Sequence, residues 1–154
     1  MKIKLAKPWM IDKLKEVNIA DERGLVLYTA VQFNVQPVTG KQVAGEVIKN
    51  VFSIFTLGVM SYQNSEWIPA LISISKDKVW IVKRNFKKKT PASEVASNSF
   101  TIDREEVSSY EMVKWTMGMY ILKIAFVDGS QMEVIASKKE LEFYDANIIP
   151  LLKK

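Results

Sequence analysis

The sequence predicts an α+β protein: a strongly bent antiparallel sheet or open barrel of about seven strands, capped by a C-terminal helix, with an extra amphipathic helix after the first strand. Three observations predict it. An alternating apolar run near the N-terminus is followed by a helix-period segment, residues 68–136 are strand-like, and the last segment carries a helical stripe. Consecutive antiparallel strands closed by one helix favour a curled sheet plugged by that helix.

The first fifty residues predict a helix and then a strand. Pro8 can open a helix because its missing N–H costs nothing in the first turn. Apolar residues at helical spacing extend this prediction to residues 8–18. After a turn at residues 21–24, alternation predicts a strand with one buried face. Its apolar members are Leu25, Leu27, Val31, Phe33 and Val35.

From Val43 the apolar period changes to 3.6, which predicts an amphipathic helix at about 41–60. Packing on the domain itself or on a second subunit is the favoured interpretation. Because the apolar arc is wide for one small domain to cover, a homo-oligomer interface is the more specific hypothesis. The alternative is a membrane interface, but the polar face carries a single lysine, Lys49, where membrane-surface helices are rich in Lys and Arg. The residues that would make either contact are Val47, Val51, Phe52, Ile54 and Phe55.

Residues 68–136 predict a succession of strands at 70–75, 79–84, 100–102, 107–113, 119–127 and 131–136. Lys76-Asp77-Lys78 is predicted to turn the first hairpin. Asp128-Gly129 predicts a two-residue turn in the last hairpin. Residues 87–98 are expected to form a polar loop, and charged residues at 103–106 separate two short strands.

The C-terminal segment predicts a helix over residues 138–152. Ser137 followed by Glu140 is the pattern of a capping box. Pro150 is expected to bend or end the helix. The apolar stripe is predicted to be Leu141, Tyr144, Ile148 and Leu151.

Composition bounds the function. The 154 residues suit a single domain, and no linker long enough to divide two domains is present. Cys and His are absent, which excludes structural zinc sites, Cys–His pairs and Ser-His-Asp triads. Asp103, Glu105 and Glu106 crowd one turn without the separation that acid–base pairs need. We therefore expect no catalysis, no metal and no cofactor.

The N-terminus is charged and lacks the apolar core of a signal peptide. The absence of cysteine also fits a reducing compartment. The expected location is the cytoplasm, with peripheral attachment to the inner face of the membrane as an option.

Several segments together resemble the pleckstrin-homology-like superfold, specifically its bacterial, GRAM-like members. The hairpin at 70–82, the polar-then-apolar strand at 100–110, the hairpin at Asp128-Gly129 and the helix from Ser137 carry the resemblance, over roughly residues 23–152. It implies a non-enzymatic scaffold that docks lipid headgroups, peptides or partner domains. Two departures are the insertion at about 37–67 and the lack of a basic motif between the first two strands, so the resemblance does not extend to phosphoinositide specificity.

The densest charge feature is a run of five cations: Lys83, Arg84, Lys87, Lys88 and Lys89. The favoured interpretation is a solvated loop that blunts a sheet edge. Contact with an anionic membrane or a phosphate is the second interpretation. Nucleic acid is the least favoured, because one aromatic, Phe86, is not a stacking platform.

An apolar group surrounds Trp115 and consists of Met112, Met117 and Met119. Methionine adapts to partner surfaces, but core filling is the favoured interpretation here. The sequence as a whole favours a binding module that acts through protein–protein contacts and self-associates. A peripheral membrane module is the alternative, and a nucleic-acid accessory protein, which rests on the net charge of +5 alone, is third.

Overall fold

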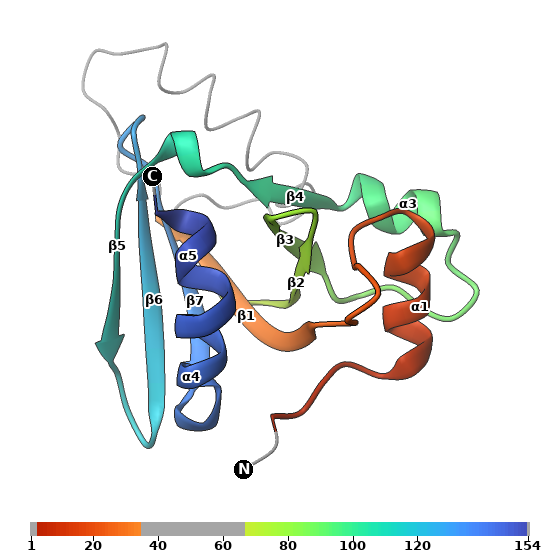
Figure 1. The fold of residues 1–154 in the computed structure, drawn as a ribbon, viewed down its shortest axis with the longest axis horizontal. Helices are drawn as coiled ribbons and strands as arrows, with labels where there is room; N and C mark the ends of the chain where they lie inside the picture. The colour runs from red at the N-terminus through yellow and green to blue at the C-terminus, as the bar shows by residue number, and fades with distance from the viewer. Residues whose placement is uncertain (1–2, 35–66, 154) are drawn as a thin grey trace.

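The computed structural model describes residues 3–34 and 67–153. In this part of the chain, seven antiparallel strands form one sheet in the order β4-β3-β2-β1-β7-β6-β5. The sheet curls around a C-terminal helical segment (Figure 1). This confirms the predicted bent antiparallel sheet with its terminal helix. The strands are β1 (Val26–Asn34), β2 (Ile68–Ser75), β3 (Lys78–Lys83), β4 (Ser99–Ile102), β5 (Val107–Lys114), β6 (Met119–Phe126) and β7 (Gln131–Ser137). The amphipathic helix expected at about 41–60 lies outside the described residues.

Strand β1 joins the two halves of the sheet. Its first part, Val26–Val31, pairs with β2, and its second part, Val31–Asn34, pairs with β7. The N-terminal segment meets the other edge of the first part: Leu5 forms a bridge to Leu27, and the Ala6 N–H donates to the Val26 carbonyl oxygen at 2.8 Å. β1 thus pairs with β2 along one edge and with β7 along the other, and Val31 is the residue that pairs with both.

The inner face of the curled sheet forms the main core. Strand residues such as Leu27, Ile72 and Leu122 are buried against the C-terminal helix. The helix contributes Phe143, Tyr144, Ile148 and Leu152 to this core. The bent sheet alone would leave its concave face open, so the helix supplies the apolar surface that fills it.

A second core covers the outer face of β2 and β3. The helices α1 (Pro8–Glu16) and α3 (Ala92–Ser97) pack there, and Leu71 and Val82 point toward them. The neighbouring residues in each strand point into the main core. β2 is therefore buried on both faces, which explains why its sequence reads as a continuous apolar run rather than an alternating one.

Helix α3 corrects the prediction of a polar loop over residues 87–98. It has six residues, and Val95 is its buried one. One buried side chain leaves no helical period in the sequence. Pro91, which precedes it in extended conformation, is the local signal that could have located its start.

Two hairpin turns differ in detail from expectation. Ser75 pairs with Lys78, so the first turn is Lys76-Asp77 alone, and both residues have positive φ, 52° and 61°. In the last hairpin the Phe126 N–H donates to the Ser130 carbonyl oxygen at 2.9 Å. The loop there is thus one residue longer than the predicted Asp128-Gly129 turn, with Gly129 at φ 93°.

The C-terminal helix contains a widened turn. A 3₁₀ turn (Lys138–Glu140) leads into α4 (Leu141–Phe143), a π-helical turn (Tyr144–Ile148) and α5 (Ile149–Leu152). A π turn shifts the helix phase, so Leu152 is buried instead of the predicted Leu151. Pro150 does not end the helix, because it sits in the first turn after the π-helical turn.

Candidate functional site

Strand β5 is the last strand at one edge of the described sheet. It has eight residues and pairs with β6 on one side, whereas no described strand pairs with its other side. The opposite edge, β4, has four residues and is flanked by α3, with the Ser99 hydroxyl bonded to the Ala96 carbonyl oxygen at 2.6 Å. Proteins commonly shorten or cover their edge strands. Here β4 is short, whereas β5 has eight residues and no described strand pairs with its outer side.

The backbone groups that β5 presents can be assigned from its pairing. The Trp115 N–H donates to the Met119 carbonyl oxygen at 3.0 Å, immediately after the strand. Bonded and non-bonded pairs alternate in an antiparallel ladder. The register pairs Met112 with Leu122 and Tyr110 with Ile124, so the N–H and C=O groups of Met112 and Tyr110 point to the free edge. They are available to a further strand.

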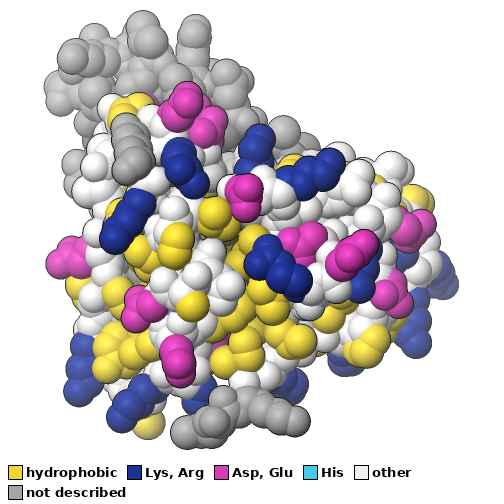
Figure 2. Space-filling view, in the orientation of Figure 1, with side chains coloured by type: hydrophobic (Ala, Val, Ile, Leu, Met, Phe, Trp, Pro, Cys, Tyr) yellow, Lys and Arg dark blue, Asp and Glu magenta, His cyan; other side chains and the backbone are white. Residues whose placement is uncertain are grey.

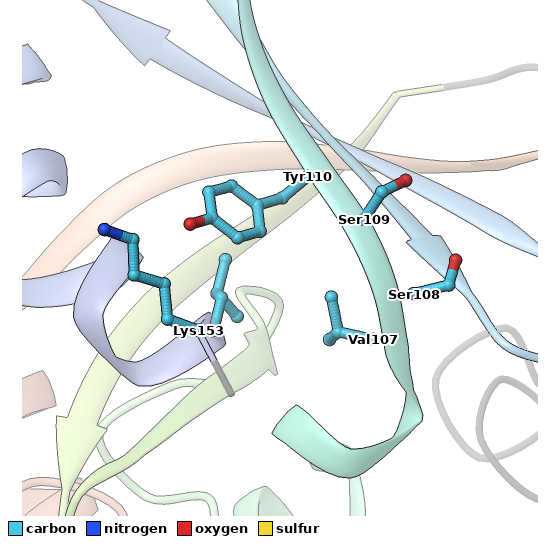
Figure 3. A pocket seen from close by; sticks show the side chains of 6 residues that line it. Val107, Ser108, Ser109, Tyr110 and Lys153 are labelled. Carbon is cyan, nitrogen blue, oxygen red and sulfur yellow. The ribbon is translucent and has the colours of Figure 1, made fainter.

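An open cavity of about 250 Å³ lies between the first half of β5 and the end of the C-terminal helix. Figure 3 shows the Val107 and Tyr110 side chains on the side of the strand that faces this helix, with Ser108 and Ser109 on the other side. Lys153 stands beside the Tyr110 ring at the rim. The cavity is lined by Val107, Ser108, Ser109, Tyr110, Leu152 and Lys153. It can receive one side chain of a segment lying along β5, with a cation beside it.

Sequence reasoning did not single out Ser109, Tyr110 or Lys153. A strand pattern shows which face of β5 is buried, but not which of its edges lacks a partner. A bulge between Val107 and Ser109, where the Ser108 hydroxyl donates to the Ala125 carbonyl oxygen at 3.1 Å, also shapes the cavity. The two serines at 108–109, which interrupt an apolar strand, are the one sequence signal for this cavity.

The predicted cationic run is divided by the structure. Lys83 is the last residue of β3, and Arg84 follows it in a bend, where its N–H donates to the Pro69 carbonyl oxygen at 3.2 Å. The Arg84 guanidinium lies 5.2 Å from the Tyr28 ring centroid, and the Lys4 ammonium 5.9 Å from it. Lys87, Lys88 and Lys89 are exposed in the following loop. Their role in anion binding stays a prediction.

The loop that carries these lysines is anchored. Phe86 is buried and packs edge-on against Trp9 at 5.7 Å, and Lys13 of α1 donates to the carbonyl oxygens of Lys88 and Thr90. No described carboxylate lies within 4.0 Å of Lys83, Arg84 or the three loop lysines. In Figure 2, Lys and Arg side chains gather at the right-hand end of the molecule, around α1 and α3.

The apolar group around Trp115 is also divided. Met112 is half-buried against the main core, as core filling requires, and Met119 is half-buried. Met117 is 95% exposed and Trp115 is 48% exposed. Trp115 packs on Trp67 with ring centroids 5.7 Å apart. The prediction of core filling is therefore wrong for Met117.

Asp21, Glu106 and Tyr144 have shifted pKa values. Burial, followed by the charges of Asp103 and Asp128, raises the pKa of Glu106. The Arg23 guanidinium, hydrogen-bonded to Asp21, lowers the pKa of that carboxyl. Burial raises the pKa of Tyr144, the Glu140 charge adds to this, and the Thr29 hydroxyl opposes it. These groups are spread over three parts of the fold and do not converge on one cavity.

Two features of the described residues bear on metal binding and on membrane spanning. Among residues 3–34 and 67–153, no group of three or more Asp and Glu side chains is arranged to hold a metal ion. Over the same residues, no helix has the length and apolar character required to cross a bilayer.

Comparisons with known proteins give a likeness to solved structures. No protein-family model matches the chain, and no curated protein matches it. Among solved structures, the chain is similar to the pleckstrin homology domain of USP37, with a TM-score of 0.40 and 8% identity, over 81% of this chain and 95% of that one. A resemblance to bacterial, GRAM-like members stays a prediction, and what the chain binds has to be argued from its own surfaces.

Proposed function

We propose that this chain is a non-enzymatic, protein-binding module that takes an extended segment of a partner protein along the free edge of β5. The observation that supports this most directly is the pair of β5 edge residues, Tyr110 and Met112, whose backbone groups point away from β6. An added strand would pair with these groups, and one of its side chains would enter the cavity beside Leu152.

The residues that line the cavity indicate which kind of partner segment would bind there. Val107 and Leu152 offer an apolar floor, and the Lys153 ammonium stands at its rim beside the Tyr110 ring. An apolar side chain next to an acidic residue or a terminal carboxylate fits this lining. Backbone pairing supplies affinity, and the cavity supplies selectivity.

The experiment is a selection from a random peptide library displayed on phage, with the whole chain as bait. We expect enriched peptides to be extended and apolar-acidic, and their amide chemical-shift changes to map to β5 and α5. Failure to enrich any peptide, or shifts confined to another surface, would contradict the proposal.

A matched pair of variants tests the backbone pairing. Met112→Pro removes an N–H that points to the free edge and leaves the β5–β6 hydrogen bonds in place, whereas Met112→Ala shortens the same side chain and keeps that N–H. We expect Met112→Pro to abolish binding of a selected peptide and Met112→Ala to weaken it by a few-fold. Equal effects of the two variants would show that the side chain, and not strand addition, carries the binding.

Self-association is a separate part of the proposal, since it was inferred from the segment at about 41–60. Sedimentation velocity over a range of concentrations measures it. We expect a concentration-dependent mass that is unchanged in Met112→Pro. Loss of the larger species in that variant would instead indicate that β5 pairs with β5 of a second copy.

A second candidate function, contact with anionic lipid headgroups through the loop at residues 87–89, is favoured by one observation: its lysines have no described carboxylate partner. Co-sedimentation with anionic and neutral liposomes, compared with Lys87→Glu, Lys88→Glu, Lys89→Glu, tests it. Pelleting that requires anionic lipid and is lost in the triple variant would support the candidate. Absence of wild-type pelleting would exclude it.

A further inference from the structure

The hairpin between β5 and β6 ends in an apolar tip, here called the hairpin tip (Trp115–Gly118). Met117 is 95% exposed there, the largest exposed fraction of any large hydrophobic side chain in the described residues. Trp115 is half exposed and is held in place by packing on Trp67. The tip therefore presents a methionine and a positioned indole to solvent.

The backbone of the tip is strained and fixed. Met117 has φ 47°, in the left-handed region that large side chains avoid. Three hydrogen bonds hold the turn: Trp115 N–H to Met119 O, Met119 N–H to Thr116 O, and Lys138 N–H to Gly118 O. Glycine or asparagine would relieve the strain. Met117 gains almost no burial in return for this strain.

Lysines surround the tip. Lys114 precedes Trp115, and the backbone bond from Lys138 to Gly118 (3.0 Å) places Lys138 and Lys139 next to it. All three are exposed, and none has a described carboxylate within 4.0 Å. The adjacent Glu140 carboxylate accepts the Ser137 N–H at 2.9 Å. Figure 1 shows the hairpin and the start of the C-terminal helix reaching the same lower end of the molecule, where blue and yellow side chains lie together in Figure 2.

We propose that the hairpin tip inserts into the interface of a membrane that contains anionic phospholipids. Met117 and Trp115 enter the boundary between headgroups and acyl chains, and Lys114, Lys138 and Lys139 contact headgroup phosphates. Methionine, an interfacial tryptophan and flanking lysines are the side chains that this interface accommodates. A protein partner needs a surface of roughly 800 Å², which a convex four-residue turn does not offer. The proposal is independent of peptide binding along β5.

The test is flotation of the whole chain with vesicles of phosphatidylcholine, with and without phosphatidylserine. We expect binding that requires phosphatidylserine and decreases with salt. Met117→Asn should lower the partition coefficient by about tenfold, because it removes the apolar group that enters the bilayer. The same variant should melt at an equal or higher temperature, since asparagine tolerates positive φ. Lys138→Gln with Lys139→Gln should also lower partitioning, by about tenfold or more.

Val127→Asn is the matched control. Val127 is another exposed apolar residue beside a hairpin turn, 62% exposed, but its neighbours Asp128 and Glu106 are acidic. It lies at the opposite end of β6, and we expect its substitution to leave vesicle binding unchanged.

No flotation of wild type would overturn the proposal, as would flotation unaffected by Met117→Asn. Flotation lost only in Lys87→Glu, Lys88→Glu, Lys89→Glu would place the membrane contact on the other basic loop. A change of mass in Met117→Asn, measured by sedimentation, would instead identify the tip as a contact between copies of the chain.

Discussion

The ammonium group of Lys13 donates a hydrogen bond of 2.8 Å to the carbonyl oxygen of Lys88, and a second of 2.6 Å to that of Thr90. Lys13 of α1 thus anchors the loop at residues 87–90, which carries three other lysines. The Lys87 N–H and Thr90 hydroxyl, 2.9 Å apart, brace the loop from inside. The loop keeps its shape through these bonds and not through ion pairs with described carboxylates.

Lys13→Met should loosen this loop. The substitution keeps an apolar stem on α1 but removes two charge-assisted hydrogen bonds, which at a partly exposed position should cost about 1 kcal/mol of unfolding free energy. We expect faster amide hydrogen exchange over residues 87–90 as well. Lys15→Met, on the exposed face of the same helix, is the control. If both variants lost the same unfolding free energy and showed the same amide exchange over residues 87–90, the hydrogen bonds from Lys13 would not stabilise the loop.

The Lys76-Asp77 turn should accept a stabilising change. Both residues have positive φ in a two-residue hairpin turn, the conformation for which Asn-Gly is favoured. Lys76→Asn with Asp77→Gly should raise the free energy of unfolding by about 1 kcal/mol, because it relieves left-handed strain. Urea denaturation measures this. Lys78→Asn, at the first position of β3, should bring no gain, and a similar gain there would refute the strain argument.

The fold was predictable where sequence signals are local. The alternation in β6, the strand pair around Lys76-Asp77 and the capping pair Ser137 and Glu140 each depend on neighbouring residues, and each forms as expected. Helix α3 and the shift from Leu151 to Leu152 were missed. A six-residue helix has too few turns to show a period, and a π turn breaks the period that the prediction assumed.

The candidate sites were less predictable because they depend on distant pairing. Whether β5 is an edge is decided by where β1 pairs, and Gln32 of β1 pairs with Glu133 of β7, far along the chain. No local pattern carries that information. The cationic run was visible in the sequence, but the contact of Arg84 with the Tyr28 ring, far from it along the chain, was not. Exposure of Met117 depends on a backbone conformation that methionine rarely adopts.

Glu106 should make stability depend on pH. Its pKa in the folded protein is raised, chiefly by burial, so the folded state binds the proton more tightly than the unfolded state. Stability should therefore fall as pH rises from the ordinary carboxyl pKa through the raised value, and stay level above it. Glu106→Gln should remove this fall and be more stable than wild type at neutral pH. Glu105→Gln, which removes the same charge from an exposed side chain, is the control for net charge. If the difference in unfolding free energy between wild type and Glu106→Gln did not change with pH, the raised pKa of Glu106 would be contradicted.

Glu140→Ala should weaken both the start of the C-terminal helix and the hairpin tip. The Glu140 carboxylate accepts the Ser137 N–H, and the next N–H, from Lys138, donates to Gly118 in the tip. Loss of a capping interaction costs about 1 kcal/mol, and the freed helix start should let residues 116–119 exchange their amide hydrogens faster. Glu142→Ala, two residues along and exposed, removes the same charge without touching the cap. If exchange in the tip rose equally in both variants, the coupling would be electrostatic and not mechanical. Faster exchange in Glu140→Ala alone would show that the helix cap positions Met117.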